Sequence, residues 1–279
     1  MILLDGKKVS QDIKDSLKQD VSEIVAQNKR APHLSIVLVG NVMASQIYVK
    51  NKIKACEYTG IKATLIKKEE TITTEELLLL VDELNNDSDV DGIIVQLPLP
   101  KHIDEQLIIN KISYLKDVDG FGIENKGRLF SGLNCFKSAT PYGIIKLLEA
   151  YNLDITGMNA VVVGRSNIVG KPMSMMLLDK NATVTICHSK TRDLKNVTNK
   201  ADLLVVAIGK TKFITEDMVK DGAIVIDVGM NRDEHGLCGD VDFESVSQKA
   251  SYITPVPGGV GPLTIAMLLT NTLLAYKRK

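Results

Sequence analysis

Lys52 and Tyr48 lie one turn apart in residues 44–60, a stretch whose apolar spacing is typical of a helix. At about 100° per residue, Lys52 falls on a face of small and aromatic residues with no other charge. The remaining charged residues of the stretch gather on the opposite side: Lys50, Lys54 and Glu57. A lysine on an inward face is partly desolvated, which disfavours its charged form and enables proton transfer near neutral pH. The alternative is that the ammonium group snorkels past the helix edge into water.

Gln96 ends a predicted strand and is a second candidate for the site. It closes residues 92–96, and the following Leu-Pro-Leu-Pro forces an extended exit from the strand. In open α/β sheets, ligands bind outside the carboxyl ends of the strands. A neutral amide at that place would hydrogen-bond a substrate or hold Lys52 without adding charge. The alternative is an amide that only caps local backbone groups.

Asp119 lies in residues 116–121, Lys-Asp-Val-Asp-Gly-Phe, which have the composition of a turn. Asp-Gly turns are common and need no function. The functional hypothesis is that one carboxylate faces a cleft and accepts two hydrogen bonds from a flat, amino-pyrimidine-like ligand. Residues 254–264 form a second unusual loop, with three glycines and three prolines. That loop either closes over a ligand or makes a sharp return between domains.

A glycine turn after the predicted strand 160–163 is a candidate phosphate-binding site. The turn reads Gly164-Arg-Ser-Asn-Ile-Val-Gly170, and a helix follows with Pro172 at its start. Such a turn directs backbone N–H groups and a helix N-terminus at a phosphate. Ser166 stands where the dinucleotide fingerprint has its second glycine, which weakens the case for close backbone approach there. The alternative is a tight turn that binds nothing.

The end of the next predicted strand, residues 183–187, indicates which dinucleotide would bind. An NAD site usually has an acid there for the ribose 2′-hydroxyl. Here the strand is followed by His-Ser-Lys-Thr-Arg, residues 188–192, which offers hydroxyls and cations and no acid. This composition favours the 2′-phosphate of NADP, and Arg165 could make a second charge-assisted contact. The alternative is that Lys190 and Arg192 are ordinary solvated surface.

Alternating strands and helices must position these side chains. In the first half we expect helices near residues 9–28, 44–59, 74–85 and 104–110, and strands at 34–39, 63–66 and 92–96. In the second half we expect strands at 160–163, 183–187, 202–208 and 223–227, all nearly continuous apolar runs. This order predicts parallel sheets covered by helices, hence an α/β fold of two domains. For residues 116–141 we expect a loop-rich passage between the domains, with the boundary near residue 139. We expect a last helix near residues 263–277 to return and pack on the first domain.

Bulk composition excludes several classes of protein. The 279 residues carry 34 basic and 34 acidic side chains, so no overall field favours a polyanionic partner such as nucleic acid. We find neither a membrane-spanning apolar run nor a secretory N-terminus, and therefore expect a cytoplasmic protein. The four cysteines and four histidines lack metal-ligand spacing, so we expect no metal.

Five motifs occur together and in order along the chain, and with them it resembles the bifunctional methylenetetrahydrofolate dehydrogenase/methenyltetrahydrofolate cyclohydrolase family over nearly its whole length. Any one motif could arise by chance, but five in register could not. The motifs are Ser45-x-x-Tyr48-x-x-x-Lys52, Gly92-Ile-Ile-Val-Gln-Leu-Pro-Leu-Pro100, Lys116-Asp-Val-Asp-Gly120, Gly164-Arg-Ser-x-Ile-Val-Gly170 and Pro255-Val-Pro-Gly-Gly-Val-Gly-Pro262.

The resemblance implies an N-terminal catalytic, folate-binding domain over residues 1–138, completed by the C-terminal helix 263–279. It also implies an NADP-binding Rossmann-type domain over residues 139–262, with the folate in a cleft between the two domains. The resemblance further implies that the protein is a homodimer and acts in one-carbon metabolism and purine biosynthesis. Through these motifs, Lys52 matches the family's catalytic lysine, and Gln96 matches the residue that orients that lysine. Tyr48 matches the aromatic residue that stacks on the substrate, and Asp119 matches the aspartate that anchors the pterin. Further matched positions are Pro257, Gly258 and Gly259 for substrate, and Gly164, Arg165, Ser166, Ser189 and Met230 for NADP.

The chain departs from the family pattern at a few positions. Tyr114 stands where proline is usual, Gly122 where histidine is frequent, and Met230 where isoleucine is usual. The segment usually read as Pro-Cys-Thr-Pro is Ser-Ala-Thr-Pro here, residues 138–141. These changes affect the expected hinge and cofactor edge more than the catalytic face.

The expected activity is oxidation of 5,10-methylenetetrahydrofolate by NADP⁺ followed by hydrolysis of the methenyl product to 10-formyltetrahydrofolate. One alternative is an NADP-dependent dehydrogenase of another small substrate, with Lys52 and Asp119 as acid and base. A second is a non-catalytic nucleotide-sensing module, which the change at residues 138–139 raises as a hypothesis.

Overall fold

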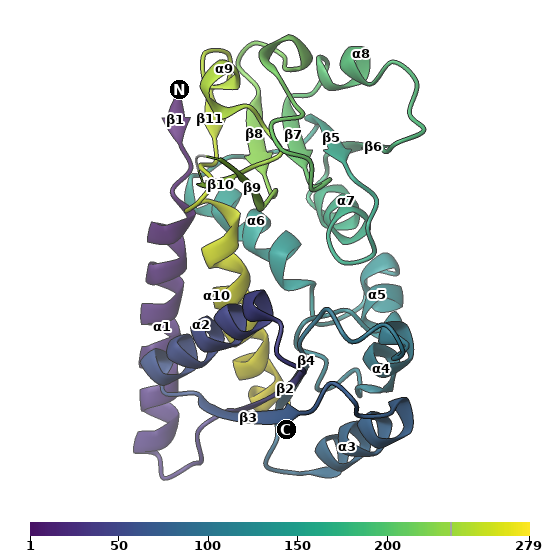
Figure 1. The fold of residues 1–279 in the computed structure, drawn as a ribbon. Coiled ribbons are helices and arrows are strands. Elements are labelled where there is room, and N and C mark those ends of the chain that lie inside the picture. Colours follow the sequence, from purple (N-terminus) through teal and green to yellow (C-terminus); the bar gives the residue numbers. More distant parts are fainter. Residues whose placement is uncertain (235) are drawn as a thin grey trace. The chain divides into compact units, whose positions relative to one another are not determined.

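The chain divides into two units, both α/β, in the computed structural model (Figure 1). Unit 1 comprises Met1–Ser10 and Thr140–Thr264, and unit 2 comprises Gln11–Ala139 and Ile265–Lys279. The structure describes residues 1–234 and 236–279, except for the side chain of Ala44. Two helices begin in unit 1 and continue in unit 2: α1 (Gly6–Ala26) and α10 (Val260–Lys277).

A six-stranded parallel sheet forms the centre of unit 1, in the order β1-β11-β8-β7-β5-β6. Its strands are β1 (Ile2–Leu3), β5 (Asn159–Val163), β6 (Thr183–Cys187), β7 (Leu203–Val206), β8 (Ile224–Asp227) and β11 (Tyr252–Ile253). Both β7 and β8 are buried along their whole length. Helices must therefore cover both faces, which explains why these strands are continuous apolar runs and do not alternate.

The remaining elements of unit 1 connect these strands. They are α6 (Ala139–Ala150), α7 (Gly170–Asp179), α8 (Leu194–Thr198), the 3₁₀ turn η1 (Glu216–Met218), α9 (Phe243–Val246) and the antiparallel pair β9 (Asn231–Asp233) and β10 (Gly236–Cys238). The loops after β5, β7, β8 and β11 all leave the same, carboxyl edge of the sheet, because its strands are parallel.

A three-stranded parallel sheet, in the order β3-β2-β4, forms the centre of unit 2. The strands are β2 (His33–Val39), β3 (Lys62–Lys68) and β4 (Gly92–Val95), with β2 buried along its whole length. The helices are α2 (Met43–Thr59), α3 (Thr74–Asn86), α4 (Glu105–Lys111), α5 (Ile123–Phe130) and the later part of α10. Core residues Val37, Leu77, Val81, Ile93 and Ile108 pack between β2, β4 and the helices α3 and α4.

Local sequence explains where the helices of unit 2 begin and end. Thr73 and Glu76 form a capping box at the start of α3, so two N–H groups without helical partners are satisfied. Gly60 ends α2 in the left-handed conformation, with φ of 79°, which glycine adopts at little cost. A capping aspartate, Asp104, begins α4 by accepting from the N–H groups of Gln106 and Leu107.

The predicted fold class, α/β with parallel sheets, is confirmed. The prediction of a loop-rich passage over residues 116–141 is wrong in part, because α5 lies inside it and α6 begins at Ala139. Gly127 sits within α5 with open space at its Cβ position, and Pro141 lies in the first turn of α6, where its missing N–H costs nothing. No helix among the described residues is both long and apolar enough to cross a membrane.

Candidate functional site

Helix α2 carries Lys52 on its inward face, as its spacing predicts. Ser45, Val49, Cys56 and Thr59 on that face are buried, whereas the three other charged residues of the stretch are exposed. Lys52 itself is half-buried. Tyr48 is 41% exposed, so its ring retains surface on which a flat ligand could stack.

The ammonium group of Lys52 contacts the side chain of Gln96. Its Nζ donates to Gln96 Oε1 at 3.0 Å. The backbone N–H of Gln96 donates to the carbonyl of Val37 at 2.9 Å, and its Nε2 donates to the carbonyl of Leu97 at 2.7 Å. The backbone of Gln96 is thus fixed by β2 and its amide nitrogen by the carbonyl of the next residue, which leaves the amide oxygen directed at the lysine.

Asp119 brings a carboxyl group within electrostatic reach of Lys52. Burial raises the pKa of Asp119 above its ordinary range, and the nearby Lys52 charge opposes part of this shift. Its turn is attached to the edge of β4, because Ile93 and Asp117 form a parallel bridge. Asn271 of α10 holds the same turn by donating to the carbonyl of Val118 at 2.8 Å. An amine, an amide and a carboxyl group therefore gather at the carboxyl end of β4, which suits proton transfer and recognition of a polar ring.

Asp117, whose role the sequence did not indicate, fixes the turn that carries Asp119. It is buried, and its oxygens accept from the N–H of Phe121 at 3.1 Å, the N–H of Gly122 at 2.8 Å and Nδ2 of Asn125 at 2.9 Å. Asn125 accepts in turn from the N–H of Phe136 at 3.0 Å. Burial, opposed by these hydrogen bonds, raises the pKa of Asp117 to about 6.

Changing Asp117 to Asn tests the cost of burying this carboxylate. The folded-state pKa of about 6 lies above the ordinary value of 3.8, so the folded protein binds the extra proton between these values. The contribution of Asp117 to stability is therefore fully present below the ordinary pKa and is lost as the pH rises through 6. We expect the free energy of unfolding of the wild type, minus that of Asp117→Asn, to fall by about 2.4 kcal/mol between about pH 4 and pH 7.

Urea denaturation across this pH range measures that difference. Asp12→Asn, which removes an exposed carboxyl group of α1, is the control for the loss of one carboxyl group. A difference for Asp117→Asn that stays level or rises with pH would contradict the raised pKa.

Two departures from the family pattern also support this turn. The hydroxyl of Ser138 is buried and donates to the carbonyl of Gly120 at 3.1 Å. At Gly122, a Cβ would lie 2.9 Å from Asp117 Oδ2, so a side chain there would displace that carboxylate. Tyr114 places its ring 5.0 Å from the guanidinium of Arg128. We find no structural reason for Ala139.

Ser45 is a second residue whose role the sequence did not indicate. Its Oγ is buried and is the one described buried side-chain polar atom without a hydrogen-bond partner. A buried hydroxyl left unpaired costs about 1–3 kcal/mol. Ser45 lies one turn before Tyr48 and Val49 on the inward face of α2, so it is a candidate to bind water or ligand.

In unit 1, the glycine turn after β5 has the close backbone approach that a phosphate site requires. Gly164 has φ of 134°, and a Cβ there would lie 2.3 Å from the carbonyl oxygen of Ala207. A Cβ at Gly170 would lie 2.3 Å from the carbonyl oxygen of Gly164. Ser166 accepts through Oγ from the N–H groups of Val169 and Gly170, at 3.1 and 3.3 Å. The serine at the second glycine position therefore closes the turn onto the start of α7.

The predicted ribose site lies on the neighbouring strand. Val163 of β5 pairs with Cys187 of β6, so the residues that follow each strand share one edge of the sheet. Arg165 after β5 is exposed, and so are the residues that follow β6: Ser189, Lys190 and Arg192. These cationic and hydroxyl groups meet the requirement for a 2′-phosphate.

The other predicted residues of unit 1 follow β8 and β11. Met230 is half-exposed after β8. Gly258 has φ of 107°, and a Cβ at Gly259 would lie 2.6 Å from the carbonyl oxygen of Pro255. The Val256–Pro257 peptide bond is cis. Glycine is therefore required for the shape of this loop.

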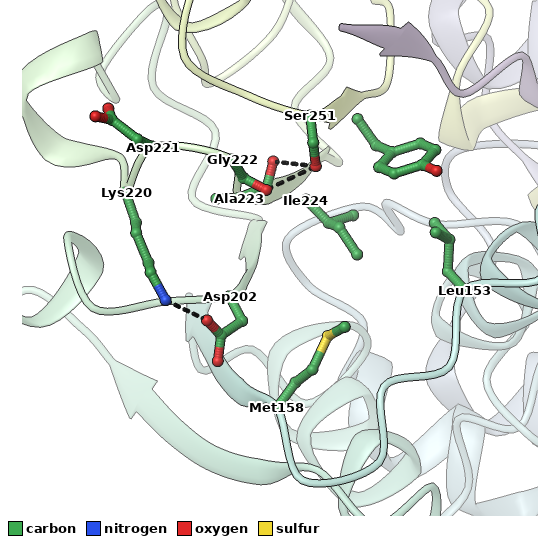
Figure 2. Close-up of a pocket in the computed structure, with 10 residues that line it drawn as sticks. Leu153, Met158, Asp202, Lys220, Asp221, Gly222, Ala223, Ile224 and Ser251 are labelled. Atoms are coloured by element: carbon green, nitrogen blue, oxygen red, sulfur yellow. Dashed lines mark hydrogen bonds and ion pairs between the residues drawn. The ribbon is translucent and has the colours of Figure 1, made fainter.

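A pocket of about 280 Å³ lies at the opposite, amino edge of the unit 1 sheet (Figure 2). Lys220 pairs with Asp202 at 2.5 Å, and Ser251 donates to the carbonyl of Gly222 at 2.6 Å, so these polar groups already satisfy one another. No predicted site residue lines it. The lining residues are Leu153, Met158, Asp202, Lys220, Asp221, Gly222, Ala223, Ile224, Ser251 and Tyr252. The described residues also include no group of three or more His, Cys, Asp or Glu side chains that could hold a metal ion.

Comparison with known proteins identifies similar chains along the whole length. The model of the tetrahydrofolate dehydrogenase/cyclohydrolase catalytic domain matches residues 4–119, and that of the NAD(P)-binding domain of the same family matches residues 138–279. The chain is 58% identical to the bifunctional protein FolD of Sulfurihydrogenibium sp. (strain YO3AOP1), covering 100% of this chain and 99% of the relative.

Solved structures give the same result. The bifunctional FolD enzyme of Campylobacter jejuni, a methylenetetrahydrofolate dehydrogenase/cyclohydrolase, has a TM-score of 0.98 and 53% identity, covering 100% of this chain and 99% of that one. The Trypanosoma brucei enzyme, complexed with NADP and an inhibitor, has a TM-score of 0.95 and 36% identity, covering 100% and 98%. A shikimate dehydrogenase from Aquifex aeolicus, at 16% identity and a TM-score of 0.53, shares the fold alone.

Proposed function

Because this chain belongs to the tetrahydrofolate dehydrogenase/cyclohydrolase family, we propose that it performs both reactions of that family on one polypeptide. It oxidises 5,10-methylenetetrahydrofolate to the methenyl form with NADP⁺ and hydrolyses that product to 10-formyltetrahydrofolate. The observation that carries this proposal is the hydrogen bond from Lys52 to Gln96 beside Asp119, which supplies a positioned amine for the hydrolysis.

NADP fits the carboxyl edge of the unit 1 sheet. The turn after β5 has no room for side chains at Gly164 and Gly170, as close approach to a pyrophosphate requires. Arg165 and Ser189 would hold the 2′-phosphate, and Ser166 and Met230 would contact the rest of the cofactor. Bound NADP⁺ supplies the hydride acceptor, so the contribution of the protein to this step is mainly to position the substrate.

In the hydrolysis, Lys52 is the proposed proton-transfer group. As a neutral amine it takes a proton from the attacking water at Nζ, and as an ammonium it returns that proton to the departing nitrogen. Gln96 holds Nζ in line through its amide oxygen and adds no charge that would oppose the cationic substrate.

Asp119 and Tyr48 bind the folate in this proposal. A carboxyl group can pair with the ring N–H and amino group of a pterin through two hydrogen bonds, and the exposed tyrosine ring stacks on a flat ligand. We also assign Pro257, Gly258 and Gly259 to substrate binding, because glycine shapes that loop.

The domain assignment follows from these sites. We assign folate chemistry to residues 1–138 with 263–279, and NADP binding to residues 139–262. We further propose that the protein is a cytoplasmic homodimer that supplies one-carbon units for purine biosynthesis. Sedimentation of the purified protein would distinguish a dimer from a monomer.

A spectroscopic assay of the purified protein tests the function. We expect 5,10-methylenetetrahydrofolate with NADP⁺ to produce reduced cofactor, and the methenyl intermediate to appear and then decay. The 2′-phosphate contacts predict faster reduction of NADP⁺ than of NAD⁺. Reduction of neither nucleotide would exclude the dehydrogenase assignment, and turnover of a different carbonyl or hydroxy substrate alone would favour the alternative dehydrogenase.

A further inference from the structure

Two buried carboxylates at the carboxyl edge of the unit 1 sheet have no role in the chemistry described above. Asp227 ends β8 and is 3% exposed, and Asp240 follows β10 and is 0% exposed. A buried carboxylate is costly unless hydrogen bonds satisfy its oxygens. The groups that satisfy these two therefore indicate what the carboxylates hold in place.

Asp240 collects N–H donors from two separate loops. Its Oδ2 accepts from the backbone N–H groups of Ile208 at 2.6 Å and Gly209 at 3.0 Å. Its Oδ1 accepts from the N–H of Lys210 at 2.8 Å and from Nδ2 of Asn231 at 2.8 Å. Residues 207–210 follow β7, and Asn231 begins β9 directly after the loop that follows β8, so one carboxylate connects the segments that follow two neighbouring strands.

These hydrogen bonds also orient the peptide groups of the first loop. In a trans peptide the N–H and the preceding C=O point in opposite directions. Because the N–H groups of residues 208–210 all point at Asp240, the carbonyl groups of residues 207–209 point away from it. The loop therefore presents hydrogen-bond acceptors on the side away from Asp240.

Asp227, at the end of β8, accepts hydrogen bonds from the backbone of Asp240 and its neighbours. Its Oδ1 accepts from the N–H of Gly229 at 2.8 Å and the N–H of Asp240 at 2.9 Å, and its Oδ2 accepts from the N–H of Val241 at 2.9 Å. Burial raises the pKa of Asp227 to about 6, with the charge of Asp240 adding to the effect and the three N–H groups opposing it. A Cβ at Gly239 would lie 1.8 Å from Asp227 Oδ2, so only glycine fits beside this carboxylate.

The strand order puts the loops after β7 and β8 side by side at the carboxyl edge of the sheet, next to the turn after β5. If the turn after β5 holds the pyrophosphate and the end of β6 holds the adenosine ribose, the nicotinamide half would extend in the other direction, over β7 and β8, because the strand order is β8-β7-β5-β6. We propose that Asp227 and Asp240 are positioning residues that shape the loops 207–210 and 228–231 to receive the nicotinamide half of NADP⁺. This inference rests on the proposed function, since that function supplies the ligand.

Asp240→Asn tests the inference in the full-length protein. Asparagine has one acceptor oxygen, and its NH₂ group would face two of the four N–H donors, so the loops must rearrange. We expect the Kd for NADP⁺, measured by calorimetry, and the KM for NADP⁺ to rise about tenfold or more. We expect the cyclohydrolase rate to stay within about twofold, because Lys52, Gln96 and Asp119 belong to unit 2 and general acid–base chemistry depends on those groups.

Asp242→Asn is the matched control, since that carboxylate accepts from Ser245 Oγ at 2.7 Å and accepts from neither loop. If Asp240→Asn does not fold, Asn231→Ala removes one of the four donors, leaves both carboxylates in place and should weaken NADP⁺ binding less strongly. The inference would be overturned if the variant that folds bound NADP⁺ with unchanged affinity. It would also be overturned if NADP⁺ binding and the rate of hydrolysis fell by the same factor. Calorimetry needs no folate turnover, so wild-type protein that binds NADP⁺ but does not oxidise methylenetetrahydrofolate overturns only the proposed function.

Discussion

Replacing Lys52 with methionine should abolish hydrolysis of methenyltetrahydrofolate while the protein stays folded and still binds NADP⁺. Methionine keeps the length and apolar stem of lysine but neither accepts nor donates the proton, and positioned acid–base groups contribute about 10²–10⁴-fold to rate. The substitution leaves Gln96 Oε1 without its partner at 3.0 Å. Gln96 is half-buried, so water can replace that partner and the loss of stability should be about 1 kcal/mol.

Lys54→Met is the matched control, because Lys54 lies on the exposed side of α2 and the change removes the same charge. Decay of methenyltetrahydrofolate absorbance, thermal denaturation and NADP⁺ calorimetry together separate lost chemistry from lost structure. If Lys52→Met hydrolysed the substrate at half the wild-type rate or more, Lys52 would not be the proton-transfer group.

Much of unit 2 could be predicted from sequence because local patterns encode it. The 3.6-residue period identified the inward face of α2, and the Pro-rich exit after Gln96 marked the carboxyl end of β4. The contact between Lys52 and Gln96 joins residues 44 positions apart, yet it followed from the rule that ligands gather at strand ends. Helix α5 was not predicted because Gly127 lies within it, and glycine is a poor helix former.

The supporting carboxylates could not be predicted, because their partners come from tertiary packing. Asp240 is 32 residues from Ile208, and no local pattern shows that its oxygens point at the loop after β7. Asp117 lies beside Asp119 in an ordinary turn sequence, and only its burial and the contact from Asn125 distinguish their roles. Residues that bind a ligand often fall in recognisable motifs, whereas the residues that hold those motifs are spread along the chain.

Changing Gly170 to alanine should strongly weaken NADP⁺ binding by opening the turn after β5. A Cβ at this position would lie 2.3 Å from the carbonyl oxygen of Gly164 and 2.8 Å from the backbone N of Arg165. Both are backbone atoms, which cannot rotate away as the end of a side chain can. The start of α7 must therefore move away from the turn, at a cost of about 1–3 kcal/mol in stability. We expect the Kd for NADP⁺ to rise about 100-fold or more, since both the N–H groups and the helix end would be misplaced.

The same methyl group placed at Gly127 provides the control, because beyond the backbone of its own helix no atom lies within 4 Å of the Cβ position, and the residue sits in a regular helix. Gly127→Ala should leave NADP⁺ binding unchanged and stabilise the protein slightly, by up to about 1 kcal/mol. Hydrolysis of methenyltetrahydrofolate should survive in both variants, because the groups proposed to transfer the proton and to anchor the pterin, Lys52, Gln96 and Asp119, lie in unit 2. Wild-type affinity for NADP⁺ in Gly170→Ala would mean that the cofactor does not depend on this turn, and loss of hydrolysis in parallel would indicate general unfolding.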